Sequence, residues 1–146
     1  MQFTFTSEQH QFREMVQRFL KEKSPPTEVR RLMETDHGYD EKIWEQLSSE
    51  LGLQSLSVPE QYGGAGFGFV ELGIVMEEMG RSLLCAPYFS STVLATTAIL
   101  NAGDETQKQF LLPGLAGGGT RAALAITEPN GQWLASGTQM IAEAKG

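Results

Sequence analysis

The sequence is poor in cysteine and in positive charge. Cys85 is its single cysteine, which excludes an internal disulfide framework and suits a reducing compartment. Eleven basic residues stand against 18 acidic ones, and the formal net charge is −7. There is no basic patch or basic amphipathic helix of the kind that binds nucleic acid or membrane surfaces. The amino terminus lacks the charged-then-apolar pattern of a signal peptide. We therefore expect a cytoplasmic chain that binds neither nucleic acid nor membranes.

Charge is missing altogether from residues 82–103. This stretch is long enough to cross a bilayer, but Pro87, Asn101 and several serines and threonines within it disfavour a transmembrane helix. The alternative is a helix that protein buries on most sides. Because a chain of 146 residues has a small interior, we expect another part of the protein or a partner to cover this helix.

Apolar residues at helical spacing predict six helices. Thr6 and Gln9 form a capping box that begins the first helix, and Phe12 and Phe19 belong to its apolar stripe. Trp44 lies on the apolar face of the third helix, which we expect to pack on that stripe. The helices after the first are expected around residues 29–33, 41–51, 69–83, 88–102 and 105–111, and the last should break near Pro113.

The character of the sequence changes near residue 120, where polar and apolar residues begin to alternate. Residues 122–127 have the pattern of a short β-strand that Pro129 ends. Two or three short strands do not form a stable sheet alone, so we expect a fragment or a chain that another chain completes. The expected fold class is mainly all-α, with six helices and one or two short β-strands at the C-terminal end.

None of the short motifs names a reaction. The glycine-rich run at residues 64–68 lacks the preceding strand and the following acidic residue of a dinucleotide-binding loop. Glu77 and Glu78 are adjacent, so they point in different directions on a helix and do not form a catalytic pair. His10 and His37 have no partners at metal-ligand spacing. We assign no catalytic residue and no metal ligand in this chain.

The segments taken in order resemble the amino-terminal region of acyl-CoA dehydrogenases. The resemblance covers residues 3–129, and each piece alone is weakly specific. The matching pieces are FTSEQHQFREMVQRFL, WEQLSSELGLQSLSVPEQYGGAGF, ELGIVMEEMGRSL, SSTVLATTAILNAG, GDETQKQFLLPGLAGG and ALAITEP. The resemblance implies an α-helical amino-terminal domain over residues 1–120 and the truncated start of a β-barrel middle domain over residues 121–146.

The same resemblance implies a reaction and its partners. Members of the family oxidise an acyl-CoA thioester to the trans-2-enoyl-CoA and pass a hydride to FAD. A glutamate removes the α-proton, and an electron-transfer flavoprotein accepts the electrons. Family members assemble as dimers or tetramers, so a homo- or hetero-oligomer is expected here. The catalytic glutamate belongs to the carboxy-terminal half of the family pattern, which this chain lacks, so the chain alone should be inactive.

Site residues follow by position from the family's Thr-Glu-Pro turn. Ser90 and Leu94, on the uncharged fifth helix, would face the acyl tail of the substrate. Leu124, Ile126 and Thr127 would lie along the flavin, with backbone groups and the Thr127 hydroxyl hydrogen-bonded to its pyrimidine end. Two simpler alternatives stay open, because apolar helix residues such as Leu94 are usually core and a threonine hydroxyl can also cap a turn.

One segment departs from the family pattern. After Thr-Glu-Pro the family usually continues with a small Gly-Ser-Asp type loop that contacts flavin and the CoA phosphates. Residues 130–134 read Asn-Gly-Gln-Trp-Leu instead, and Trp133 stands where a serine is expected. Some members of the family form mixed assemblies in which one type of subunit has lost its flavin site. The alternative function is therefore a flavin-site-degenerate or non-catalytic partner subunit that acts as a helical scaffold.

Overall fold

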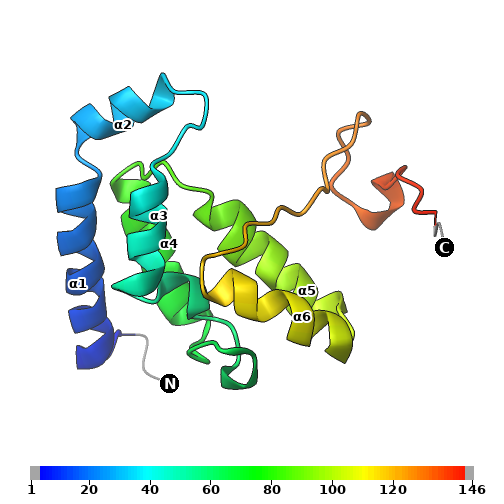
Figure 1. The fold of residues 1–146 in the computed structure, drawn as a ribbon, viewed down its shortest axis with the longest axis horizontal. Coiled ribbons are helices and arrows are strands. Elements are labelled where there is room, and N and C mark those ends of the chain that lie inside the picture. The colour runs from blue at the N-terminus through cyan, green and yellow to red at the C-terminus, as the bar shows by residue number, and fades with distance from the viewer. Residues whose placement is uncertain (1–3, 144–146) are drawn as a thin grey trace.

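The computed structural model describes residues 4–143, and α-helices dominate this part of the chain (Figure 1). No helix in it is both long enough and apolar enough to cross a membrane. A π-helix, η3, leads directly into α5; two short 3-10 helices lie between α3 and α4, and a third follows α6. The elements are α1 (Ser7–Lys23), α2 (Pro26–Met33), α3 (Glu41–Ser49), η1 (Leu53–Ser55), η2 (Glu60–Tyr62), α4 (Phe69–Arg81), η3 (Phe89–Ala95), α5 (Thr96–Ala102), α6 (Glu105–Ala116) and η4 (Ala135–Gly137).

The helix ends follow local sequence signals. The expected capping box is confirmed, because the Thr6 hydroxyl accepts from the Gln9 N–H while the Gln9 side chain accepts from the Thr6 N–H. The Asp40 carboxylate caps α3 by accepting from the N–H of Lys42. Gly52 follows α3 with φ of 63°, a left-handed conformation that glycine adopts at little cost.

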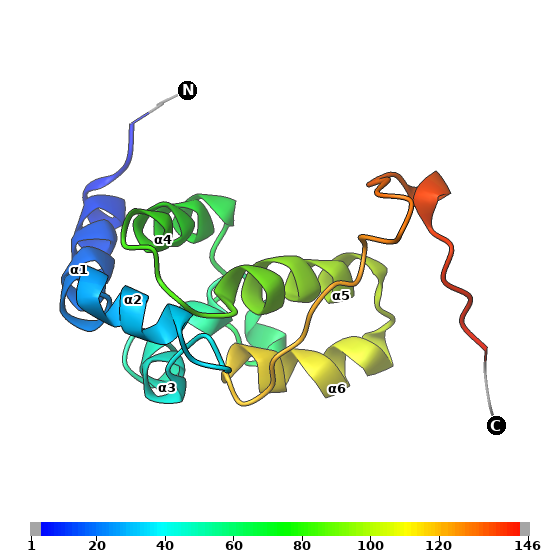
Figure 2. The ribbon, with the colours of Figure 1, turned by 90° about the horizontal axis from the view of Figure 1, so that it is seen from above.

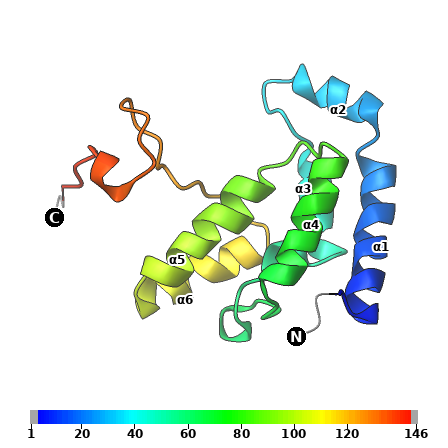
Figure 3. The ribbon, with the colours of Figure 1, turned by 180° about the vertical axis from the view of Figure 1, so that it is seen from behind.

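Helices α1, α3 and α4 lie side by side and enclose the main core, as Figures 1 and 3 show from opposite sides. Trp44 and Leu47 of α3 are buried in one cluster with Phe19 of α1, and Phe12 packs against it. The expected burial of Trp44 and Leu47 together with Phe19 is therefore confirmed, although the helix that packs most extensively on α1 is α4. Between α1 and α4, Arg13 forms ion pairs with the carboxylates of Glu77 and Glu78.

Helices α5 and α6 form a second layer beside the first three (Figure 2). The predicted break at Pro113 is wrong, since α6 continues through it to Ala116. The missing proline N–H and the ring clash cost about 3 kcal/mol. Leu112 and Leu115 are both buried in the same helix, and each gains roughly 1.5–3 kcal/mol by burial, which offsets that cost.

The chain after α6 leaves the helical bundle and projects to one side (Figures 1 and 2). The predicted strand at residues 122–127 is absent, and residues 4–143 contain no β-strand at all. A β-strand exists only when a neighbour accepts and donates its backbone hydrogen bonds. The described part of the chain offers this segment no such neighbour, so it stays extended and unpaired.

Candidate functional site

The uncharged stretch predicted to line the acyl site forms η3 and α5. Within η3 the winding is wider than in an α-helix, because the Thr96 N–H reaches back to the Ser91 carbonyl. The Thr96 hydroxyl donates to the same carbonyl at 3.1 Å. π-helical turns are rare and occur frequently at functional sites. This turn therefore makes η3 a candidate functional segment.

The two predicted acyl-site residues both lie on η3. Ser90 and Leu94 are half-buried, and the Ser90 hydroxyl donates to the Pro87 carbonyl at 3.2 Å. Tyr88 precedes them, with its hydroxyl donating to the Leu53 carbonyl at 2.7 Å, and burial raises the pKa of Tyr88. The beginning of this helix is thus fixed to η1, while Ser90 and Leu94 remain partly accessible.

The chain that follows α6 is fastened to α3. The Trp44 indole N–H donates to the Gly118 carbonyl at 2.8 Å, and the Ser48 hydroxyl donates to the Gly117 carbonyl at 2.7 Å. Arg121 then forms an ion pair with Glu41 at 3.3 Å. These contacts bring the chain across the bundle from α6 towards η3.

One contact was missed by the sequence reasoning. The Ser91 hydroxyl accepts a hydrogen bond from the Ala122 N–H at 3.2 Å, and Ser91 is buried. A buried hydroxyl in an uncharged helix needs a partner, which was a readable signal, but the sequence does not say where that partner lies. This bond attaches the start of the segment predicted to contact flavin to η3, the helix that carries Ser90 and Leu94.

The three predicted flavin-contacting residues follow Ala122 directly. Leu124, Ile126 and Thr127 are exposed, and within residues 4–143 the backbone of residues 123–127 makes no hydrogen bond to protein. The structure therefore joins the two predicted groups of residues through one hydrogen bond rather than enclosing them in one cavity. The unpaired amides and carbonyls and the Thr127 hydroxyl are the donors and acceptors that a flavin pyrimidine ring requires, so this segment fits the group.

The loop that departs from the family pattern is closed by its own side chains. The Glu128 carboxylate accepts from the N–H groups of Gln139 and Met140 at 2.6 and 3.1 Å. The Asn130 amide donates to the Gly137 carbonyl at 2.6 Å. Trp133 is 78% exposed near the tip of this loop. The indole is thus held out from the protein, at the position where a small residue is expected.

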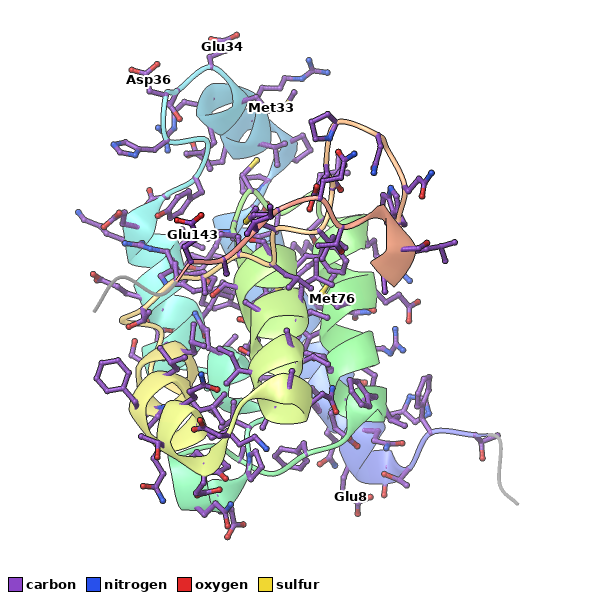
Figure 4. The ribbon with its side chains drawn as sticks, turned by 90° about the vertical axis from the view of Figure 1, so that its right-hand side faces the viewer. Glu8, Met33, Glu34, Asp36, Met76 and Glu143 are labelled. Carbon is purple, nitrogen blue, oxygen red and sulfur yellow. The ribbon has the colours of Figure 1, made fainter. Side chains whose placement is uncertain are left out.

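A groove lies elsewhere on the molecule, and none of the predicted site residues lines it. Its volume is about 860 Å³, and it lies between α1, α2 and the end of α4, lined in part by Val29, Met33 and Leu83. Figure 4 shows Met33, which lines this groove, near the top of the view, and Glu8, at the start of α1, near the bottom. Within residues 4–143 no group of three or more His, Cys, Asp or Glu side chains is placed to hold a metal ion.

Comparison with known proteins decides the family. The family model described as acyl-CoA dehydrogenase, N-terminal domain, matches residues 6–119. The chain belongs to the acyl-CoA dehydrogenase family. The mitochondrial isovaleryl-CoA dehydrogenase of Bos taurus is 37% identical to it over 145 residues, which cover 95% of this chain and 33% of that relative. The chain thus spans about a third of the length of the curated relatives it matches.

Solved structures agree with this assignment. The ChsE4–ChsE5 complex from Mycobacterium tuberculosis matches with a TM-score of 0.80 and 27% identity, over 90% of this chain and 36% of the matched chain. An acyl-CoA dehydrogenase from Bacillus anthracis, solved in complex with FAD, matches with a TM-score of 0.77 and 28% identity. That match covers 86% of this chain and 21% of the other. The helical fold is thus that of the family's amino-terminal domain.

Proposed function

We propose that this chain supplies the helical wall of the acyl site in an FAD-dependent enzyme that oxidises an acyl-CoA thioester to the trans-2-enoyl-CoA. The observation that carries the proposal is the uncharged helix η3–α5, whose residues 90 and 94 are half-buried in a chain of this family. An acyl tail is apolar, so a wall without charge keeps it out of water without burying an unpaired ion.

The domain division belongs to the same proposal. Residues 1–120 would form the helical domain, and residues 121–146 would begin a β-barrel middle domain whose remaining strands pair with residues 122–127. The catalytic glutamate would lie outside this chain. The bound FAD would supply the acceptor for the hydride that leaves the β-carbon of the acyl group.

The residues of this chain would bind and orient the two reactants. Ser90 and Leu94 would contact the acyl tail and exclude water from it. Leu124 and Ile126 would present backbone amides and carbonyls to the flavin, and the Thr127 hydroxyl would donate to its pyrimidine end. Donors fixed in a dry site stabilise developing negative charge strongly because they need no reorganisation.

Partners and location complete the proposal. An electron-transfer flavoprotein would take the electrons, and identical or different subunits would assemble as a dimer or tetramer. The support is the family assignment, together with the similarity to the ChsE4–ChsE5 complex. With one cysteine in the chain, a reducing compartment such as the cytoplasm suits it.

A second candidate function rests on Trp133. The exposed indole stands on a loop closed by Glu128 and Asn130, where the family pattern has a small residue that approaches flavin. A bulky ring there would obstruct that approach. On this alternative the chain is a partner subunit without flavin, and its helices serve as an assembly scaffold.

Colour separates the two candidates. The full-length protein should purify yellow, and its flavin absorption should bleach when acyl-CoA is added without oxygen. A folded oligomer that stays colourless after incubation with FAD would refute the enzyme and support the scaffold.

A variant tests the acyl wall itself. Leu94→Trp should lower kcat/KM progressively more for longer acyl chains, by roughly 10- to 200-fold at most, with flavin content unchanged. Phe110→Trp changes a residue of α6 that is 82% exposed and serves as the control. An unchanged chain-length profile in Leu94→Trp would assign Leu94 to ordinary core packing.

A further inference from the structure

Every polar group of Ser91 has a partner. Its N–H donates to the Pro87 carbonyl at 3.0 Å, its carbonyl accepts from both the N–H and the hydroxyl of Thr96, and its hydroxyl accepts from the Ala122 N–H. The residue is 2% exposed. Ser91 thus belongs to the π-turn through its backbone and to the segment after α6 through its side chain.

The bond to Ala122 is the last one between the bundle and the extended segment. Before it, Gly118, Thr120 and Arg121 are held by α3 and α6. Beyond it, among the residues that the structure describes, no hydrogen bond or ion pair joins residues 123–143 to residues 4–121. This bond is therefore the hydrogen bond to the bundle that lies nearest to residues 123–127 along the chain.

The bond between Ser91 and Ala122 lies between the residues proposed to bind the acyl tail and those proposed to bind the flavin. Ser90 precedes Ser91 immediately, and Leu94 lies one turn further along the same helix. Leu124 lies two residues beyond Ala122, and Thr127 five, which is on the order of 16 Å of extended chain. A small shift at Ala122 would thus be carried outwards to the Thr127 hydroxyl.

We propose that Ser91 is a positioning residue. Its hydroxyl holds the segment proposed to contact flavin in a fixed position relative to the helix proposed to contact the acyl tail. The inference rests on the proposed function and adds to it a residue that touches neither substrate nor flavin. The π-turn fixes the backbone of Ser91, and the hydrogen bond to the Ser91 hydroxyl fixes the position of the Ala122 N–H. The alignment of the acyl β-carbon with the flavin then depends on a bond outside both binding groups.

The expected effect is on the chemical step rather than on binding. Reacting atoms must lie within a near-attack distance, and a misplacement of about 1 Å can cost on the order of 100-fold in rate. Ser91→Ala removes the acceptor and leaves Ser90 and Leu94 in place. Substrate binding should therefore persist while the rate of flavin reduction falls.

The test uses the full-length protein with its flavin. In Ser91→Ala the rate of flavin reduction by acyl-CoA, measured in a single turnover, should fall by about 10- to 100-fold, with KM and flavin content close to wild type. Amide hydrogen exchange at Ala122 should become faster. Ser91→Thr keeps the hydroxyl acceptor and should restore both readouts. Thr92→Val removes a neighbouring buried hydroxyl that makes no bond to residues 122–143 and serves as the matched control.

Several outcomes would overturn the inference. Wild-type flavin reduction in Ser91→Ala, unchanged exchange at Ala122, or an equal loss in Thr92→Val would each do so. If Ser91→Ala does not fold, Ala122→Pro removes the donor from outside the helix and should give the same loss of rate; normal reduction in that variant refutes the role. A colourless wild-type protein refutes the proposed function first. In that case, faster amide exchange at Ala122 in Ser91→Ala would show that Ser91 holds the segment in place but aligns no reactants, and this result would also refute the inference.

Discussion

Arg13 is the residue whose removal should most sharply test how the bundle is held together. Its guanidinium lies 2.6 Å from a carboxylate oxygen of Glu78 and 2.8 Å from one of Glu77. The Glu78 side chain is 1% exposed, whereas that of Glu77 is 53% exposed. Arg81 provides a second and longer contact to Glu78, at 3.4 Å. Arg13 thus joins α1 to a buried carboxylate on α4.

The burial of Glu78 decides the size of the effect. An exposed ion pair such as Arg13 with Glu77 contributes little, because water and salt screen it. Removing one partner of a buried pair leaves an uncompensated charge and costs about 3–5 kcal/mol. Domains of this size have a total stability of about 5–15 kcal/mol. Because Arg81 still contacts Glu78 at 3.4 Å, we expect Arg13→Ala to lose about 3 kcal/mol in the free energy of unfolding, the lower end of that range.

Urea unfolding followed by circular dichroism measures this loss, and a second substitution identifies its cause. Arg13→Ala combined with Glu78→Gln should be more stable than Arg13→Ala alone, since the amide removes the buried charge. Arg18→Ala changes an exposed arginine with no ion pair among residues 4–143 and should stay within about 0.5 kcal/mol of wild type. A loss below about 1 kcal/mol in Arg13→Ala, or no recovery in the double variant, would refute the reasoning.

Three further predictions concern stability. Trp44 is 1% exposed, so Trp44→Ala should cost about 3–5 kcal/mol in thermal or urea unfolding, and a loss under about 1 kcal/mol would contradict its place in the core. Gly118 has φ of +75°, and an added Cβ would lie 2.9 Å from a side-chain carbon of α3, so Gly118→Ala should cost at least about 1–2 kcal/mol, whereas Gly119→Ala, with nothing within 4 Å, should be neutral. The Gln9 amide lowers the pKa of Glu71 below its usual 4.5, so the stability that this contact adds is present above about pH 4.5 and is lost as the pH falls through the folded-state pKa. The difference in unfolding free energy between wild type and Gln9→Leu should therefore be larger at neutral pH than in acid, where only the loss of the capping bond from the Thr6 N–H remains, and an equal difference at every pH would exclude the carboxylate as a cause.

The helix ends could be predicted because their signals are local. The Thr6 capping box, the Asp40 cap and the Gly52 stop each lie within four residues of the bonds they make, so the sequence alone contains the partners. The break predicted at Pro113 was wrong for the opposite reason, because the deciding effect is not local. The local cost of the proline is visible in the sequence, but the burial of Leu112 that offsets it is a tertiary effect.

The candidate site was predictable only in part. Positions 90 and 94 came from the family resemblance, and the structure places them on one helix, as predicted. The π-turn was not predicted, because hydrophobic periodicity does not separate a π-turn from an α-turn over one segment. The bond from Ser91 to Ala122 joins residues 31 apart, and no spacing rule connects positions that distant. The strand at residues 122–127 failed because a strand needs neighbours, and an alternating pattern does not supply them.

The two candidate functions differ in a small part of the molecule. The bundle from α1 to α6 is closed by its own contacts, with Trp44, Leu47 and Leu112 buried without any help from residues 123–143. Such a bundle folds equally well in an enzyme and in a scaffold, so its presence does not argue for chemistry. In the proposed enzyme the chemistry would depend on the segment after Ala122, which one hydrogen bond joins to the bundle, and on the loop that presents Trp133. That part of the chain is the least constrained by the helical core, so it can lose a flavin contact without loss of the fold.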